Sequence, residues 1–191
     1  MKRSEINRAY AAAVAAFGDA GWALPPQPRW DITDCGSGDF VRCGIALVNL
    51  AEEPEYSEKL IYMQPGQTIP LHTHRVKKED IICRHGRLTV ELWDGLPGDG
   101  ARGRPVRVKR SGDWVTIPSG EPVTLGPGER VTLVPGVYHR FWPETADTII
   151  GEVSTRNDDV NDNVFADPAI NRFPGIVEDE PPVIQLVSDR S

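Results

Sequence analysis

Two histidines separated by one residue, His72 and His74, are the strongest chemical signal in the sequence. In a β-strand, side chains two residues apart project from the same face, so both imidazoles can point into one cavity. Glu79 follows five residues after His74, and His139 lies sixty residues further on. Three neutral imidazoles and one carboxylate suit Mn²⁺, Fe²⁺, Co²⁺, Ni²⁺ or Zn²⁺. We expect these four residues to bind a divalent metal ion, although an isolated His-x-His pair is more often an ordinary surface or core feature. The remaining histidine, His85, lies outside this pattern and is interpreted as a turn or strand-end residue.

Glu152 and Lys59 are the candidates for acid–base chemistry. Glu152 interrupts the apolar run Thr148–Ser154, where a strand would place it on one face with Ile150 and Ser154. If that face is the interior, burial should raise the pKa of the carboxyl group, which suits a general base that also returns its proton. Lys59 could hydrogen-bond a substrate oxygen and transfer a proton. Both residues could instead be solvated side chains of exposed strands.

Polar residues near these candidates are more ambiguous. Asp162 follows the Glu152 strand and could bind substrate hydroxyl groups, but Asp is also an ordinary turn residue. Arg172 could anchor either the C-terminal tail or a substrate, and tail anchoring is favoured. Lys77 and Lys78 are expected to be solvated turn residues.

The elements that must position these side chains are mostly short strands. An amphipathic helix is expected over residues 5–17, with Ile6, Tyr10, Val14 and Phe17 on its apolar face, Ser4 as its N-cap and Gly18 or Gly21 at its end. Short apolar runs separated by Gly, Pro and Asp then indicate a β-sandwich or barrel. The expected strands are Gly44–Leu50, Lys59–Met63, Asp80–Cys83, Leu88–Trp93, Val106–Lys109, Trp114–Ile117, Val131–Val134, Arg140–Trp142 and Thr148–Val153.

Length and composition exclude several classes of protein. A chain of 191 residues predicts one domain, and a net charge of −7 argues against nucleic-acid binding. No apolar run is long enough to span a membrane. Charged residues interrupt the N-terminal alanine-rich stretch, so we expect no export signal. The three cysteines, Cys35, Cys43 and Cys83, form no Cys-x-x-Cys pair and are expected to be reduced thiols.

The spacing of the metal candidates resembles the cupin superfamily. Gly66, His72-x-His74, Glu79 and Gly86 match its first motif, and Gly128 with Pro135–His139 is similar to its second. The resemblance implies an all-β, double-stranded β-helix (jelly-roll) barrel. We expect one cupin domain over residues 1–191, with its barrel core over residues 40–154 and a C-terminal extension over residues 155–191 that packs on the barrel.

Further motifs resemble one cupin family, the D-lyxose isomerases. They include Met1–Asn7, Lys78–Ile82, Val90–Trp93, Gly151–Ser154, Asn157–Asp159, Asp162–Asn163, Arg172–Pro174 and Glu178–Pro182. The resemblance implies an aldose–ketose isomerase that depends on a metal, usually Mn²⁺, and forms a cytoplasmic homodimer. Its sugars would be D-lyxose and D-xylulose, with D-mannose and D-fructose as relatives, and it favours a functional role for Lys59. Hydrogen could move by an enediol or by a hydride shift. A cupin Fe²⁺ dioxygenase and a non-catalytic, metal-containing sugar-binding module are the alternatives.

Overall fold

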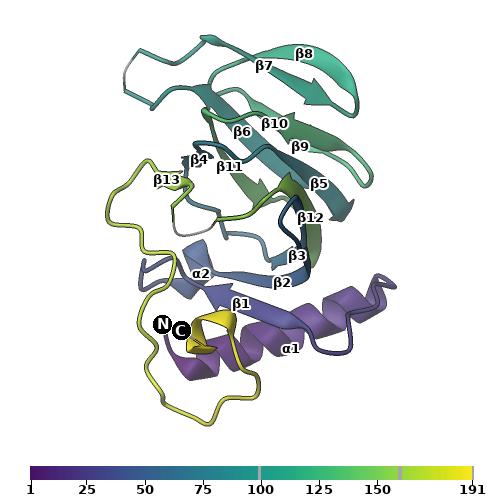
Figure 1. Ribbon diagram of the computed structural model, residues 1–191, viewed down its shortest axis with the longest axis vertical. Helices are drawn as coiled ribbons and strands as arrows, with labels where there is room; N and C mark the ends of the chain where they lie inside the picture. The colour runs from purple at the N-terminus through teal and green to yellow at the C-terminus, as the bar shows by residue number, and fades with distance from the viewer. Residues whose placement is uncertain (99, 159–160, 191) are drawn as a thin grey trace.

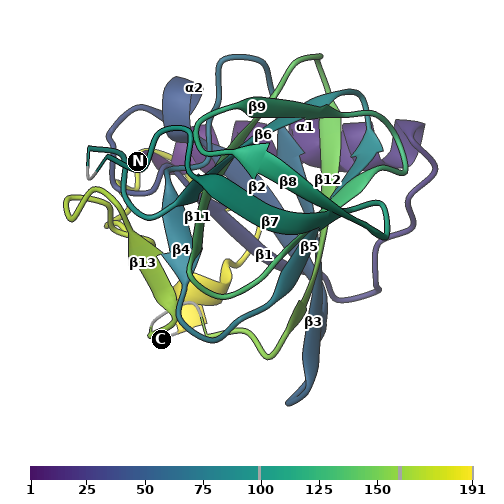
Figure 2. The same ribbon diagram turned by 90° about the horizontal axis from the view of Figure 1, so that it is seen from above.

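The computed structural model describes residues 1–98, 100–158 and 161–190, with two antiparallel β-sheets that face each other (Figures 1 and 2). The larger sheet has eight strands, in the order β1-β2-β3-β12-β5-β10-β7-β8. The smaller sheet has five strands, in the order β13-β4-β11-β6-β9. The bounds of the larger sheet's strands are β1 Arg29–Thr33, β2 Ile45–Glu52, β3 Tyr56–Met63, β5 Glu79–His85, β7 Pro105–Arg110, β8 Asp113–Pro118, β10 Arg130–Leu133 and β12 Thr148–Thr155. Those of the smaller sheet are β4 His72–His74, β6 Leu88–Asp94, β9 Pro122–Leu125, β11 Val137–Pro143 and β13 Asn163–Phe165.

Side chains alternate between the two faces of each strand, and those on the inner faces form the core between the sheets. Val90 and Leu92 of β6 and Ile81 of β5 point into this core and are at most 1% exposed. In β12, Ile150 belongs to the same core, whereas its neighbour Ile149 packs in a second cluster beside the N-terminal helix. Because side chains alternate between faces, Glu152 shares the interior face with Ile150. The expected interior face of this strand is therefore confirmed.

Helix α1 (Arg3–Asp19) covers the outer face of the larger sheet at β1, β2 and β3 (Figure 1). Phe17 stacks on Trp30 of β1 at a ring distance of 6.1 Å. The helix begins earlier than expected, with Lys2 as its N-cap, because the Ser4 hydroxyl group is hydrogen-bonded to Asp179 of the tail. Among the described residues, no helix is long and apolar enough to cross a membrane.

The C-terminal end of α1 agrees with the expectation from the sequence, whereas its buried face does not. Gly21 follows the helix with a φ of 76°, as expected for a glycine that ends a helix in the left-handed region. Val14 was expected on the buried face but is 37% exposed, and Ala13 and Ala16 are buried instead. The sheet thus approaches a face of α1 that is rotated from the one the larger side chains suggested.

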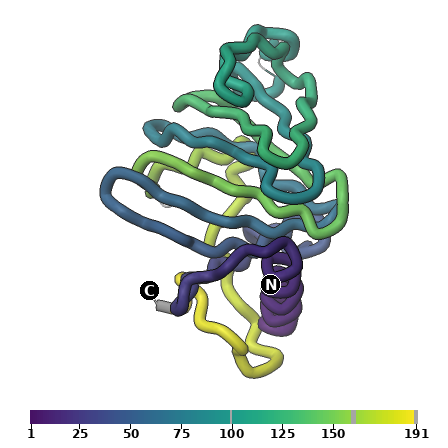
Figure 3. The backbone as a smooth tube through the Cα atoms, turned by 90° about the vertical axis from the view of Figure 1, so that its right-hand side faces the viewer, coloured from purple at the N-terminus to yellow at the C-terminus, as the bar shows by residue number. Residues whose placement is uncertain are grey.

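The C-terminal segment packs back on the barrel and on α1, as expected (Figure 3). β13 adds an edge strand beside β4, and Leu186 bridges to Trp30 of β1. Arg3 of α1 forms ion pairs with Glu178 and Asp189 of the tail. Several short elements were not expected: β1, β9, β13, the helix α2 (Phe40–Cys43) and the 3₁₀ helix η1 (Val187–Arg190).

Candidate metal centre and active site

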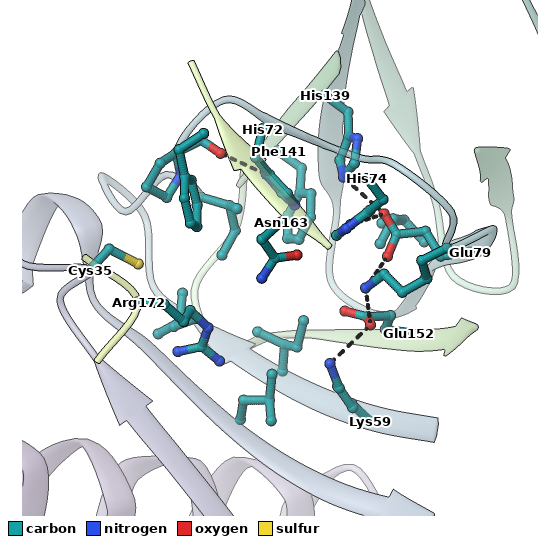
Figure 4. A pocket seen from close by; sticks show the side chains of 18 residues that line it. Cys35, Lys59, His72, His74, Glu79, His139, Phe141, Glu152, Asn163 and Arg172 are labelled. Carbon is teal, nitrogen blue, oxygen red and sulfur yellow. Dashed lines mark hydrogen bonds and ion pairs between the residues drawn. The ribbon is translucent and has the colours of Figure 1, made fainter. Parts of the chain in front are cut away.

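The four proposed metal ligands converge inside the barrel from both sheets (Figure 4). His72 and His74 project from β4, and His139 lies on β11, where it pairs with His72. Glu79 begins β5 in the opposite sheet. The candidate ligand atoms of these residues lie within 4.8 Å of one another, and His74, Glu79 and His139 are less than 5% exposed. The expected cluster therefore forms, and it could hold a metal ion.

Backbone carbonyl groups fix the orientation of two of the imidazoles. Nδ1 of His72 lies 2.8 Å from the Pro70 carbonyl oxygen, and Nδ1 of His139 lies 3.1 Å from that of Val137. A carbonyl oxygen only accepts hydrogen bonds, so each Nδ1 carries the proton and each Nε2 presents a lone pair. Metal-binding histidines are held in this way by their second ring nitrogen.

The contacts around Glu79 fit a bound cation. Oε1 of Glu79 lies 2.9 Å from Nε2 of His139 and 3.2 Å from Nε2 of His74. With Nδ1 of His139 protonated, its Nε2 and the carboxylate oxygen both face each other as acceptors. None of these three atoms has a hydrogen-bond partner among the described residues. Buried acceptors without donors are costly, and a divalent cation satisfies all three at once.

The protonation states also suit metal binding. Burial, together with the neighbouring His139 and His74, holds the pKa of His72 well below its usual value. Burial alone would raise the pKa of Glu79, but the Lys77 ammonium group and the neighbouring His139 and His74 together outweigh burial, and the pKa lies well below its ordinary range. A neutral imidazole and an ionised carboxylate are the forms that bind metal ions.

A chain of alternating charges extends from the metal cluster across the cavity. Oε2 of Glu79 lies 2.9 Å from Nζ of Lys77, which lies 3.0 Å from Oε1 of Glu152. The same Oε1 lies 3.2 Å from Nζ of Lys59, the cross-strand partner of Glu152 on β3. Lys59 also donates a hydrogen bond of 3.1 Å to the Asn157 side chain. The two candidate acid–base residues therefore lie together, beside the metal cluster.

The pKa of Glu152 differs from the sequence-based expectation. Burial raises it, as expected, but the positive charges of Lys59 and Lys77 together outweigh burial and lower it below the ordinary value. The carboxyl group is thus ionised at neutral pH and can accept a proton.

Lys77 is the main residue that sequence reasoning missed. It was expected to be solvated, yet it is 4% exposed, while the neighbouring Lys78 is exposed as expected. The carboxylate of Asp162 accepts hydrogen bonds from the backbone N–H groups of Val76 and Lys77, at 2.8 and 2.9 Å. This contact turns the Lys77 side chain inward. The available signal was its spacing of two residues from Glu79, which favours a common face.

The other residues considered in the sequence analysis lie in different parts of the structure. Both carboxylate oxygens of Asp162 bind backbone N–H groups, which gives this residue a positioning role in the turn. Arg172 lines the same cavity as the metal cluster and forms an ion pair with Asp31. His85 is exposed at the end of β5, outside the cluster, as expected. Asp159, part of one motif, lies outside the described residues. The three cysteines are free thiols.

Comparisons with known proteins agree with the resemblance. Residues 27–190 match the family model described as D-lyxose isomerase. A Serratia proteamaculans protein named D-lyxose/D-mannose isomerase is 41% identical over 164 residues, which cover 80% of this chain and 72% of the relative. A protein of the same name from Escherichia coli O157:H7 is 36% identical over 171 residues, 84% of this chain and 75% of the relative. The crystal structure of Cellulomonas parahominis L-ribose isomerase with L-ribose has a TM-score of 0.68 at 16% identity and covers 93% of this chain and 98% of that one. The structural likeness confirms the expected cupin-like barrel.

Proposed function

Because the chain belongs to the D-lyxose isomerase family and is a sugar isomerase, we propose that it interconverts D-lyxose and D-xylulose. D-Mannose and D-fructose form the second proposed pair, since the relatives from S. proteamaculans and E. coli O157:H7 are named for both aldoses. The observation that carries the proposal is the buried chain of contacts from Glu79 through Lys77 to Glu152 and Lys59. In this chain of contacts, the ionised carboxylate of Glu152 lies beside the proposed metal ligands but is not one of them.

The proposed metal ligands are His72, His74, Glu79 and His139, and Mn²⁺ is the proposed ion on the basis of the family resemblance. When bound, such an ion polarises the carbonyl group of an open-chain sugar and stabilises negative charge that develops on its oxygen. Glu79 and the three histidines would hold the ion at the end of the cavity that Lys77 also lines.

Glu152 is the proposed general base. Isomerisation of an aldose to a ketose removes a proton from C2, forms an enediol and returns a proton to C1. The carboxylate of Glu152 takes the proton from C2 and delivers it to C1. The ammonium group of Lys59 gives a proton to O1 as the enediol forms, and the resulting amine takes one back from O2 as the ketose forms. Lys77 keeps the Glu152 carboxylate ionised between turnovers and orients it toward the metal cluster. The barrel interior excludes bulk water from these groups, since Lys59, Lys77 and Glu152 are each less than 10% exposed.

The proposal is tested by restoring metal to chelator-stripped protein without oxygen. Mn²⁺ should restore ketose formation from D-lyxose, and from D-mannose, under anaerobic conditions. Bound metal without turnover would contradict the isomerase and favour the sugar-binding module. Turnover that requires Fe²⁺ and O₂ would favour the dioxygenase instead.

Two further proposals come from the family resemblance alone. We propose that the protein acts in the cytoplasm as a homodimer. Light scattering of the purified protein would contradict the dimer if it gave the mass of a single chain.

A further inference from the structure

The outer face of the larger sheet extends well beyond the helix that packs on it. Helix α1 lies against β1, β2 and β3, whereas β7 and β8 lie at the opposite end of the sheet (Figure 1). Beyond the helix, the cross-strand register aligns a row of side chains on this face: Val153, Asp80, Thr132, Lys109 and Trp114. We call this row, with Tyr56 and Arg107 beside it, the open face.

Aromatic and apolar side chains are exposed on the open face. Trp114 is 54% exposed, Tyr56 is 49% exposed and Val153 is 37% exposed. Tyr56, Val153 and Lys109 line a common hollow, which therefore spans the strands from β3 to β7. Exposed aromatic side chains around a hollow are typical of an interaction site.

The open face has opposite charges at its two ends. Glu53 and Glu55 are exposed in the turn between β2 and β3, and Glu55 also lines the hollow. On β7, the guanidinium group of Arg107 lies 4.6 Å from the centre of the Trp114 ring, and the ammonium group of Lys109 lies 5.3 Å from it. None of these four charged groups forms an ion pair with another described residue. A face with this distribution of charge is complementary to a second copy of itself after half a turn.

The strand order gives the open face an approximate two-fold symmetry. On one side of the line between β5 and β10 lie β5, β12 and β3, and on the other side lie β10, β7 and β8. A two-fold axis perpendicular to the sheet at this line therefore lays β8 of one copy over β3 of the other, and β7 over β12. This arrangement brings Trp114 of each copy to Tyr56 of the other, and Lys109 toward Glu55.

We propose that the open face is the interface of the homodimer. Trp114 of each copy packs on Tyr56 and Val153 of the other, and Lys109 faces Glu55 across the interface. Buried tryptophan and tyrosine side chains supply much of the affinity of protein interfaces, whereas complementary charges fix the orientation of the partners. This inference rests on the proposed homodimer, to which it assigns a surface.

The dissociation constant of the dimer tests this interface, and it can be measured by sedimentation velocity over a concentration series of the purified protein. Trp114→Ser should raise this constant by about thirtyfold or more, the loss that is typical of a central interface residue. Val41→Ser is the control, because it removes an apolar side chain that is 76% exposed on α2, and it should leave the constant unchanged. Dimerisation of Trp114→Ser at the wild-type affinity, or an equal shift in Val41→Ser, would overturn the proposal.

Charge reversal tests the orientation of the two copies. Lys109→Glu and Glu55→Lys each place like charges opposite one another in both halves of the dimer, so each variant alone should dimerise at least about tenfold more weakly. A dimer of one variant with the other has opposite charges in both halves. Native mass spectrometry of the mixture should therefore show this heterodimer in preference to either homodimer, and a mixture without that preference would overturn the proposal. Arg8→Glu, which reverses an exposed charge on α1, should dimerise like the wild type.

Failure of this inference can be distinguished from failure of the isomerase proposal. A wild-type protein that sediments as a single chain would overturn the homodimer and its interface, whatever its turnover. A dimer that shows the expected effects of the variants but forms no ketose would support the interface and contradict the isomerase alone.

Discussion

The Nζ atom of Lys77 lies 3.0 Å from Oε1 of Glu152, although 75 residues separate them in the sequence. The same ammonium group lies 2.9 Å from the carboxylate of Glu79. Lys77 thus connects a proposed metal ligand to the proposed general base. Its interior charge is compensated on both sides, and the pKa of Lys77 is raised despite burial.

Replacing Lys77 should change the pH dependence of the reaction. Lys77→Met removes one of the two positive charges that lower the pKa of Glu152, so that pKa should rise. A base must be ionised to act, and the acidic limb of the kcat/KM profile should therefore move to higher pH. The exposed neighbour provides the control, because Lys78→Met should leave the profile unchanged. Lys77→Arg should partly restore the wild-type limb. An acidic limb that stays in place in Lys77→Met would refute the coupling.

Neutralising the proposed base should separate catalysis from metal binding. Glu152→Gln keeps the size of the side chain but removes its basicity, and kcat should fall by about 10²- to 10⁴-fold. Metal content should remain at the wild-type level, because Glu152 is not one of the proposed ligands. Glu58→Gln is the matched control, since Glu58 lies beside Lys59 on β3 and faces away from the cavity. Near-normal turnover in Glu152→Gln would remove this residue from the mechanism.

Loss of a ligand should abolish both the metal and the stability that it supplies. His139→Ala should lose bound Mn²⁺ and activity together. In the wild type, Mn²⁺ at a hundred times its dissociation constant should stabilise the fold by about 2.7 kcal/mol, visible as a rise in Tm. That rise should be absent in His139→Ala and intact in His85→Ala, whose imidazole lies outside the cluster. A metal-dependent Tm shift that survives in His139→Ala would place the ion elsewhere.

Asp162 should act through the turn that it holds. Asp162→Ala removes two hydrogen bonds from backbone N–H groups to a charged acceptor, each of which contributes about 1.5–3 kcal/mol. Urea unfolding should report this loss, and kcat should fall because Lys77 is no longer directed inward. Asp167→Ala, which removes one exposed cap at Ala169, should have little effect on kcat. A variant that unfolds like wild type but binds sugar weakly would assign Asp162 to the substrate instead.

Local periodicity was sufficient to predict the parts of the site that lie on regular strands. Alternation placed Glu152 on the interior face with Ile150, and the cross-strand register then brings Lys59 to it. The His-x-His pair shares one face for the same reason. These predictions succeeded because a strand's own sequence fixes which side chains share a face.

The features that were missed depend on contacts between distant segments. Lys77 turns inward because of Asp162, and no local pattern reports that contact. Arg172 pairs with Asp31 on β1, a strand that was not expected from the sequence. The pKa of Glu152 was expected to rise because burial was considered without the two lysines. The secondary structure around the site could be predicted from the sequence, but the charges that the tertiary fold brings together could not.

Isomerisation of D-lyxose in D₂O by the manganese-loaded protein distinguishes proton transfer through Glu152 from a hydride shift. We expect D-xylulose that carries one deuterium at C1, detected by NMR, because the proton on Glu152 exchanges with the deuterons of the Lys59 and Lys77 ammonium groups before it is returned. Over the same reaction time, the Glu152→Gln variant and the metal-free protein should form little or no labelled ketose. Rapid formation of D-xylulose without deuterium at C1 would contradict proton transfer through Glu152 and indicate a hydride shift.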